Sequence, residues 1–220
     1  MDWINKVKNN IFPFSNEKNK ILLALQEWEY RGGVFDPEYP QEQCQLCGQQ
    51  DIRYQFEIVN KINTNSLLIG SECIKRFDIK VIDQGGAVLT GKSAYQKIDK
   101  DKRKLITDAK IRSVLNSLVN LSKKDYKFEI ENFVKYYQKR GAFTPAQLFT
   151  IIWRFEENKV NYNKSHFKVV MRREREKDQL RYMEDWKLSK IMPCLTKKQK
   201  EFIDSNKKNQ AYLKKLLQNN

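Results

Sequence analysis

The sequence of 220 residues has few of the side chains on which catalysis most often depends. It contains a single histidine and four cysteines, and neither a His-Glu-x-x-His nor a Gly-x-Ser-x-Gly pattern occurs. Cys194 follows Pro193 and has no base near it in the sequence. A nucleophile needs a base within hydrogen-bonding reach, and hydrolytic metal sites need clustered ligands at known spacings. We therefore predict that the protein is not an enzyme.

Long apolar runs are also missing. No stretch of the sequence approaches the roughly 18 consecutive apolar residues of a membrane-spanning helix. The opening residues 1–8 carry charge where the central part of a secretory signal would be apolar. These absences predict a cytoplasmic protein with no membrane partner, and a reducing cytoplasm argues against a structural disulfide.

Three of the four cysteines lie in one segment of 30 residues. Cys44-Gln-Leu-Cys47 is followed by a glycine, which favours a tight knuckle that turns two thiolates toward one ion. Residues 52–69 then alternate as a hairpin around a polar turn, and Ser71 is expected to cap a short helix that carries Cys73. Knuckle, hairpin and helix together predict a treble-clef zinc finger with Cys44, Cys47 and Cys73 as its metal ligands.

The fourth zinc ligand is left open by the sequence. Treble clefs usually take two ligands, three residues apart, from the closing helix, but Gly70 and Arg76 flank Cys73 at that spacing and neither binds zinc. The remaining candidates are Cys194, His166, a carboxylate such as Asp51, or a water molecule. Alternatively, the cysteines pack as small buried hydrophobic residues without metal.

The positive charge of the chain lies in its second half. Residues 1–100 hold 13 Lys and Arg against 13 Asp and Glu, whereas residues 101–220 hold 29 against 14, and the excess gathers in 101–127 and 187–220. Such a field attracts polyanions, of which nucleic acid is the commonest in a cytoplasm. The alternative is a lysine-rich solvated surface. The residues predicted to contact DNA or RNA are Lys75, Arg76, Lys102, Arg103, Lys104, Arg172, Arg173, Lys197, Lys198 and Lys200.

Hydrophobic periodicity predicts an α+β fold. Short strands are expected at 79–82 and 88–89, after the hairpin of the finger. The predicted helices cover residues 16–30, 100–122, 127–139, 145–157, 164–189 and 197–217. Two of them begin with a capping box, Thr144 with Gln147 and Thr196 with Gln199. We divide the chain into residues 1–98, an N-terminal helix with the finger, and residues 99–220, a basic helical domain.

The string Gly86-Ala-Val-Leu-Thr-Gly91-Lys92-Ser93 matches the phosphate-binding loop of nucleotide hydrolases. Such a loop needs a buried strand before it, a helix after it, and a later strand that supplies an Asp for magnesium. Here the interior of the loop is apolar and the residues after it have a helical pattern. We interpret the match as coincidental and expect no nucleotide cofactor.

Residues 145–177 could form a helix-turn-helix. Pro145–Glu157 would be the supporting helix, and a second helix from about Ser165 would carry Lys168, Arg172 and Arg175 on one face. Acidic residues alternate with these arginines, which favours a salt-bridged solvent face instead. The aromatic residues of the same region could stack on unpaired bases, but helical spacing favours a place in the core.

Two parts of the sequence resemble a poorly characterised group of treble-clef zinc-finger proteins from bacterial mobile elements and prophages. The first is Cys44-x-x-Cys47 with Gly70-Ser-x-Cys73-Ile-x-x-Phe77; the second is the run Gly141-Ala-Phe-Thr-Pro-Ala-Gln-Leu148 with Phe167-Lys168 and Arg172-Arg173. The resemblance implies a metal-stabilised interaction module in a bacterial or phage cytoplasm. We therefore predict a zinc-stabilised protein that binds nucleic acid, or alternatively a protein-protein module that regulates or inhibits a host or phage complex.

Overall fold

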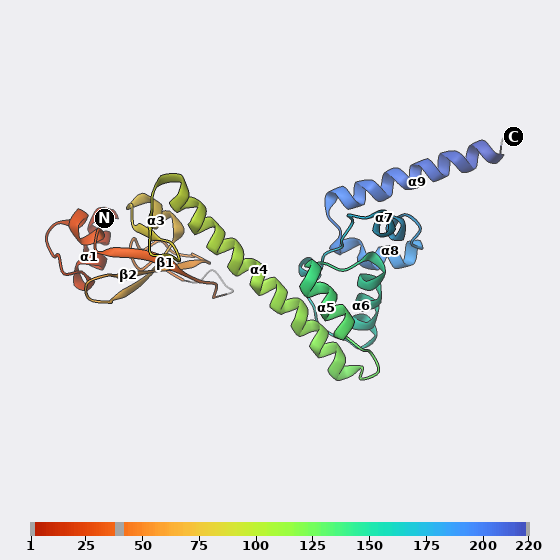
Figure 1. Cartoon of the computed structure of the whole chain (residues 1–220), viewed down its shortest axis with the longest axis horizontal. Coiled ribbons are helices and arrows are strands. Elements are labelled where there is room, and N and C mark those ends of the chain that lie inside the picture. Colours follow the sequence, from red (N-terminus) through yellow and green to blue (C-terminus); the bar gives the residue numbers. More distant parts are fainter. Residues whose placement is uncertain (1–2, 38–41, 219–220) are drawn as a thin grey trace. The chain divides into compact units, whose positions relative to one another are not determined.

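The computed structural model describes residues 3–37 and 42–218 (Figure 1). The chain forms two compact units, one ending at Asp108 and the other beginning at Ala109. The boundary falls inside helix α4 (Gly91–Lys124), which contributes side chains to the core of each unit. The sequence placed its division between residues 98 and 99 and began this helix at residue 100. Among the described residues, no helix combines the length and the apolar character needed to cross a membrane.

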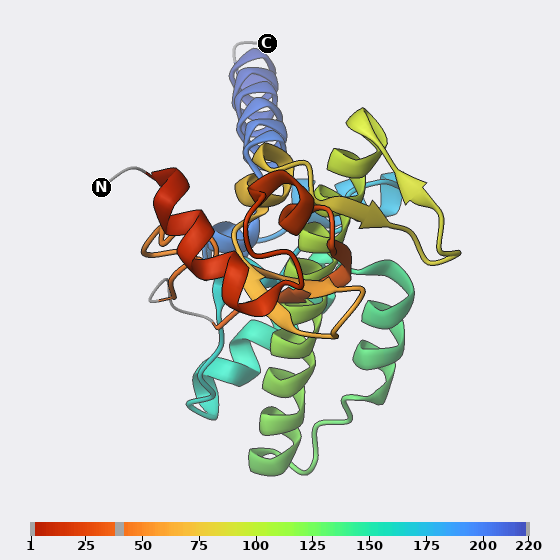
Figure 2. The same ribbon diagram turned by 90° about the vertical axis from the view of Figure 1, so that its left-hand side faces the viewer.

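The first unit is built around a five-stranded sheet. Its strands are β1 (Trp28–Phe35), β2 (Gln55–Asn60), β3 (Ser66–Ile69), β4 (Lys80–Ile82) and β5 (Val88–Leu89), in the spatial order β3-β2-β1-β4-β5. All neighbours are antiparallel except β1 and β4. The helical elements are α1 (Trp3–Ile11), η1 (Phe12–Phe14), α2 (Ile21–Leu25) and α3 (Ser71–Arg76). Helix α1, at the front of Figure 2, adds Val7 and Ile11 to the core beside the sheet.

The mixed α+β class is confirmed, and so is the predicted hairpin. Strands β2 and β3 pair Phe56 with Ile69 and Ile58 with Leu67, and these four side chains are buried. The strands expected at 79–82 and 88–89 are present as β4 and β5. Ser71, however, is not the cap of α3, because the residue before the first helical turn is Gly70 and no side chain caps this end.

The helix predicted for residues 16–30 is wrong beyond its middle. Helix α2 covers only Ile21–Leu25, and the chain then enters the central strand β1. Trp28 and Tyr30 are fully buried on alternate positions of this strand, and the Trp28 indole donates to Ser15 Oγ at 2.8 Å. Gly32 lies within the strand with φ of +117°, where the register of β1 against β2 shifts. The segment forms a strand and not a helix because its large aromatic residues are buried at every second position.

The second unit is helical. Besides the end of α4, it contains α5 (Glu131–Arg140), α6 (Pro145–Glu157), η2 (Lys164–His166), α7 (Glu174–Arg181), α8 (Asp185–Ile191), η3 (Met192–Cys194) and α9 (Lys197–Gln218). Both predicted capping boxes are present. Gln147 N–H donates to Thr144 Oγ1 at 3.2 Å, and Thr196 N–H donates to Gln199 Oε1 at 2.9 Å. Gly141 ends α5 with a positive φ, as a helix-terminating glycine does.

The single helix predicted for residues 164–189 is wrong. Residues after η2 run extended, and Val169 forms a parallel bridge with Phe143. Phe143 N–H donates to the Lys168 carbonyl at 2.9 Å, and Val170 N–H donates to the Phe143 carbonyl at 2.8 Å. These bonds remove the recognition helix of the supposed helix-turn-helix, because Lys168 and Arg172 lie before α7 rather than on one helical face. Most aromatic side chains of this region lie in or against the core, as helical spacing favoured.

Candidate metal centre

The three cysteines come from two short segments on one side of the sheet unit. Cys44 and Cys47 lie on a tight turn before β2, and Cys73 lies on α3, directly after β3. The turn is closed by Gly48 N–H, which donates to the Cys44 carbonyl at 2.8 Å. Gly48 has φ of +76°, a conformation that other residues adopt only with strain. The glycine after Cys47 therefore permits the knuckle.

The sulfur atoms of these residues are gathered closely enough to hold a metal ion. Cys73 Sγ lies 3.6 Å from Cys44 Sγ and 3.3 Å from Cys47 Sγ, and all three sulfurs lie within 4.8 Å of one another. Four sulfurs placed tetrahedrally at about 2.3 Å from a zinc ion would be roughly 3.8 Å apart. Gly70 N–H also points at Cys44 Sγ at 3.4 Å, which stabilises a thiolate there. The donor set and its spacing therefore fit a thiolate-bound metal.

The pKa values of Cys44 and Cys73 are shifted in opposite directions. A hydrogen bond from the Cys73 thiol is the main cause that lowers the pKa of Cys44 to about 5, against the opposing effect of burial. The same hydrogen bond and burial raise the pKa of Cys73 far above its ordinary value. The hydrogen bond between Cys44 and Cys73 therefore favours the thiolate form of Cys44. Metal coordination requires thiolates, so metal binding at this group is expected to release protons.

Within the described part of the chain, these three cysteines form a group without a fourth Cys, His, Asp or Glu at comparable distance. Asp51 does not join it. Cys194 is buried in the core of the second unit, where burial raises its pKa to about 11. The imidazole Nδ1 of His166 lies 2.8 Å from Ser113 Oγ, also in the second unit. Each of the two soft donors left open by the sequence therefore packs among residues of the other unit.

A pocket of about 400 Å³ opens beside the cysteines. All three of them line it, together with Arg53, Tyr54, Arg76 and Lys102. Lys102 Nζ lies 4.6 Å from the centre of the Tyr54 ring, and the Arg76 guanidinium lies 5.8 Å from the Trp3 ring. The sequence singled out Arg76 and Lys102 only as contacts for nucleic acid, and nothing in it indicated that both line the cysteine pocket. Arg53 was not singled out, because it lies between regular elements and follows no pattern.

Lys75 stands apart from this pocket. Its Nζ lies 3.1 Å from Glu72 and 4.0 Å from Asp99, and it also lies over the Tyr95 ring at 5.7 Å. Arg103 and Lys104 follow Lys102 on α4 and are exposed. No ion pair with a described residue involves Arg103 or Lys104. The predicted basic residues of the first unit therefore divide into two that line the pocket and three that do not.

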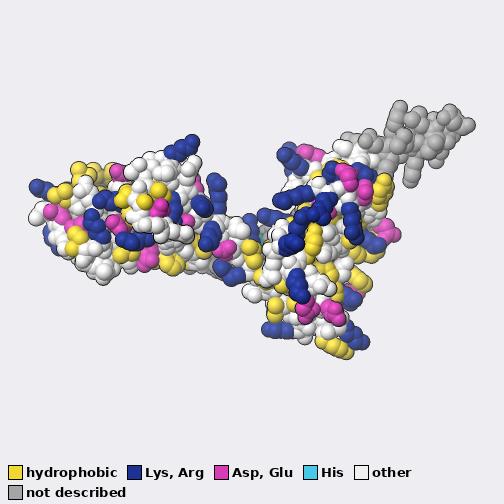
Figure 3. Space-filling view, viewed as in Figure 1, with side chains coloured by type: hydrophobic (Ala, Val, Ile, Leu, Met, Phe, Trp, Pro, Cys, Tyr) yellow, Lys and Arg dark blue, Asp and Glu magenta, His cyan; other side chains and the backbone are white. Residues whose placement is uncertain are grey.

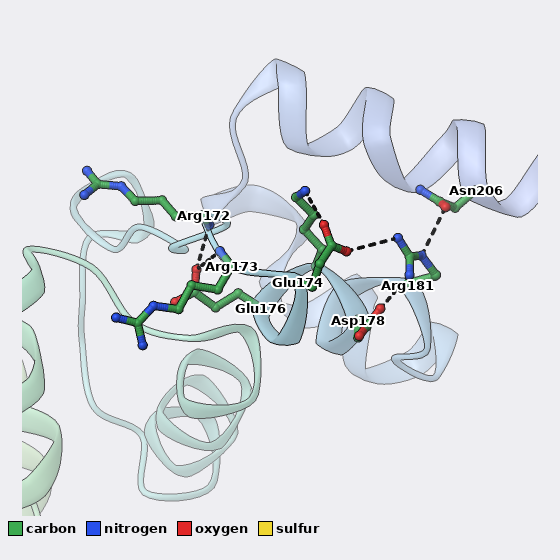
Figure 4. A network of polar contacts seen from close by, with 8 residues as sticks. Arg172, Arg173, Glu174, Glu176, Asp178, Arg181 and Asn206 are labelled. Atoms are coloured by element: carbon green, nitrogen blue, oxygen red, sulfur yellow. Dashed lines mark hydrogen bonds and ion pairs between the residues drawn. The ribbon is translucent and has the colours of Figure 1, made fainter.

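A second arrangement lies at the start of α7, where Glu176 organises two arginines (Figure 4). Glu176 is buried, with 5% of its surface exposed, and its Oε2 accepts the backbone N–H groups of Arg172 at 2.6 Å and Arg173 at 3.0 Å. Arg140 donates to its other oxygen at 3.2 Å. Burial alone would raise the pKa of Glu176, but the two N–H groups and Arg140 outweigh it and lower that pKa. The Arg172 and Arg173 side chains are exposed and extend away from the carboxylate.

The neighbouring acidic residues form ion pairs with other basic side chains. Glu174 binds Lys177 at 2.5 Å, and Asp178 binds Arg181 at 2.5 Å, while Arg181 also donates to Asn206 (Figure 4). Interleaved charges thus form salt bridges along α7, as the sequence suggested, but the two arginines before the helix take no part. At the start of α9, Lys197 and Lys198 are exposed and Lys200 is half-buried, and Lys197 has only a distant partner in Glu201 at 3.9 Å.

Comparison with known proteins adds no further constraint: no family model, no curated protein and no solved structure matches this chain.

Proposed function

We propose that this chain is a non-catalytic nucleic-acid-binding protein whose first unit is stabilised by zinc. Cys44, Cys47 and Cys73 are the proposed ligands of a treble-clef finger, and the second unit supplies the basic surface. The observation that carries the proposal is the charge of the second unit, which holds 26 Lys and Arg against 12 Asp and Glu, while the first unit holds 16 against 15.

The distribution of ion pairs supports a phosphate-binding role for that excess. Many carboxylates of the second unit already pair with nearby cations, for example Glu156 with Lys190 and Asp185 with Lys207. Arg172 and Arg173 pair with no described carboxylate through their side chains, and Glu176 fixes their backbone. Cations that are anchored but unpaired suit phosphate contacts, which position a protein on nucleic acid without reading its sequence. Figure 3 shows many Lys and Arg side chains on the face of this unit that it presents, with Asp and Glu side chains among them.

The proposed role of the zinc is structural. It would join the knuckle before β2 to α3, whereas the hydrogen bond from Gln45 N–H to the Leu68 carbonyl, at 3.0 Å, ties the knuckle to strand β3. Small units of this kind gain much of their folding free energy from the metal. The resemblance to finger proteins of mobile elements supports a bacterial or phage cytoplasm as the setting.

A protein partner is the second candidate, and a cluster of exposed aromatic residues favours it. Trp153 is 37% exposed and Trp186 53% exposed. Phe149 contacts both, with its ring centre 6.3 Å from that of Trp153 and 5.3 Å from that of Trp186. Exposed tryptophans that gather in this way are typical of protein interfaces.

Salt dependence separates the two candidates. We would measure the affinity of the full chain for single-stranded DNA, double-stranded DNA and RNA at two salt concentrations. Phosphate contacts predict binding that weakens steeply with salt, because each contact releases counterions. No binding tighter than tens of micromolar to any of the three at low salt would remove the nucleic-acid proposal and leave the protein partner.

A further inference from the structure

The cysteine group is open on the side of the pocket. Within the described part of the chain, no fourth protein ligand accompanies the three sulfurs, and all three of their residues line a cavity of about 400 Å³. That volume exceeds what one water molecule needs. A metal that completes its shell entirely from protein is closed on all sides, whereas three protein ligands beside a cavity leave a position for a molecule from outside.

The charges around the cavity indicate which kind of molecule could bind there as the fourth ligand. A divalent metal with three thiolates carries a net charge of about −1, so a further anion joins it only where cations offset the repulsion. Arg76 and Lys102 line the cavity, and neither forms an ion pair with a described residue; their contacts are with the rings of Trp3 and Tyr54. Arg53 is already matched by Asp36, at 3.2 and 3.1 Å. Two cations beside the open position are therefore left for a ligand.

Among the described residues, Glu72 is the carboxylate that lines this cavity, and it is bound to another residue. Glu72 precedes Cys73, but its side chain is 76% exposed and binds Lys75 at 3.1 Å. Of the residues that line the cavity, it is the acidic side chain best placed to bind the metal in place of an outside ligand. Substituting Glu72 therefore tests whether the fourth ligand comes from the protein itself.

We propose that a metal ion bound by Cys44, Cys47 and Cys73 takes its fourth ligand from solution, and that Arg76 and Lys102 seat a phosphate group at that position. The phosphate would replace a metal-bound water, and its remaining oxygens would accept hydrogen bonds from the guanidinium and the ammonium. The proposal rests on the proposed metal binding but goes beyond it, because it makes the finger a ligand-binding site as well as a structural one.

The test uses the full-length protein loaded with Co²⁺ in place of zinc. Absorption from sulfur-to-cobalt charge transfer reports whether the cysteines hold the metal, and the visible ligand-field bands report its fourth ligand. Inorganic phosphate, a 5′-phosphorylated oligonucleotide and the same oligonucleotide without phosphate are titrated in turn. A saturable change with inorganic phosphate supports a free anion as the ligand. A change with the phosphorylated oligonucleotide alone supports a nucleic-acid end as the source of the phosphate.

Substitutions test whether Arg76 and Lys102 bind the phosphate. Lys102→Gln and Arg76→Gln are each expected to weaken phosphate binding about tenfold or more, since each removes a charge-assisted hydrogen bond. Lys100→Gln, which removes the same charge two residues before Lys102 on α4 and outside the pocket, is the matched control and is expected to bind as wild type. Glu72→Gln is expected to leave the cobalt bands unchanged.

The outcomes are distinguishable. Absent charge-transfer absorption would contradict metal binding itself. Normal charge transfer with bands that respond to none of the titrants, or that change in Glu72→Gln, would overturn the fourth-ligand proposal while leaving the metal site intact. An equal loss of phosphate binding in Lys100→Gln and Lys102→Gln would show that only general charge matters, and would contradict phosphate binding by Arg76 and Lys102.

Discussion

Glu176 holds Arg172 by the backbone rather than by the side chain: its Oε2 accepts the Arg172 N–H at 2.6 Å. The buried carboxylate therefore fixes where the extended segment meets α7 and leaves the guanidinium exposed. A side-chain pair between the same residues would have consumed the positive charge. In this arrangement the carboxylate stabilises the fold and the cation stays available for a ligand.

Glu176→Gln is expected to destabilise the protein at neutral pH by about 1–3 kcal/mol, because the amide cannot accept from two N–H groups and Arg140 as a carboxylate does. The pKa of Glu176 is lowered in the folded state. Its contribution is therefore present above the pKa of the unfolded chain, roughly 4.3, and is lost as pH falls through the lower folded pKa.

Urea denaturation of Glu176→Gln and wild type at several pH values measures this contribution. The difference in unfolding free energy should narrow as the solution is acidified below about pH 4. A difference that stays constant down to low pH would mean that packing, and not the charge of the carboxylate, accounts for the loss.

Cys44→Ser is expected to lose bound zinc and to destabilise the first unit. The substitution removes both one of the three proposed sulfur ligands and the sulfur that accepts the Gly70 N–H. Cys194→Ala is the matched control, since Cys194 is buried in the core of the second unit. We expect one equivalent of zinc in wild type and in the control by elemental analysis, and much less in Cys44→Ser. Less than a tenth of an equivalent in wild type purified without chelator would contradict the metal site.

Lys92→Ala is expected to change neither stability nor ligand binding, although Lys92 belongs to a string that matches a phosphate-binding loop. The segment between Gly86 and Gly91 contains strand β5, which pairs with β4. It is not the continuous nest of backbone N–H groups that a nucleotide phosphate needs. A thermal shift assay with ATP and magnesium should show no stabilisation of wild type. Stabilisation by ATP that disappears in Lys92→Ala would show that the string is functional.

Local signals carried the sequence predictions that are confirmed. The capping boxes at Thr144 and Thr196 and the hairpin around residues 60–65 depend on neighbouring residues, and each formed where expected. Ser71 failed as a cap within its own turn, but the two misplaced helices involve distant partners. Trp28 left a helical pattern because its ring is buried in the core of the first unit, where its indole binds Ser15. The segment around Val169 is extended because it pairs with Phe143.

The candidate site was predictable to the same extent. Cys44, Cys47 and Cys73 could be grouped from spacing alone, because a knuckle and a helix after a hairpin are local units. The pocket beside them could not, since Lys102, which lines it next to Tyr54, belongs to a helix that begins only after β5. The hydrophobic periodicity of a sequence predicts that a helix forms, but it does not predict which distant residues that helix contacts.

The functional proposal depends on the positive charge of the second unit. We therefore test it with lysines that neither the fold nor the proposed metal site requires. Replacing Lys197, Lys198 and Lys200 by Gln removes three positive charges from the first turn of α9, where none of the three has a close ion-pair partner among the described residues. The matched control replaces Lys20, Lys61 and Lys92, three exposed lysines of the first unit. Both variants change the net charge equally.

If phosphates are bound there, the α9 variant should bind unrelated sequences more weakly by a similar factor, and the slope of log affinity against log salt should fall by about one unit per lost contact. The control should keep the slope of wild type. Replacing Arg172 and Arg173 by Gln should weaken binding further in the same uniform way, because these arginines precede α7 and lie on no recognition helix. Affinities measured by fluorescence anisotropy over a range of salt concentrations decide the question. Equal slopes in the α9 variant, the control and wild type would contradict phosphate contacts at α9, and a loss confined to one nucleic-acid sequence would assign base reading to the arginines instead.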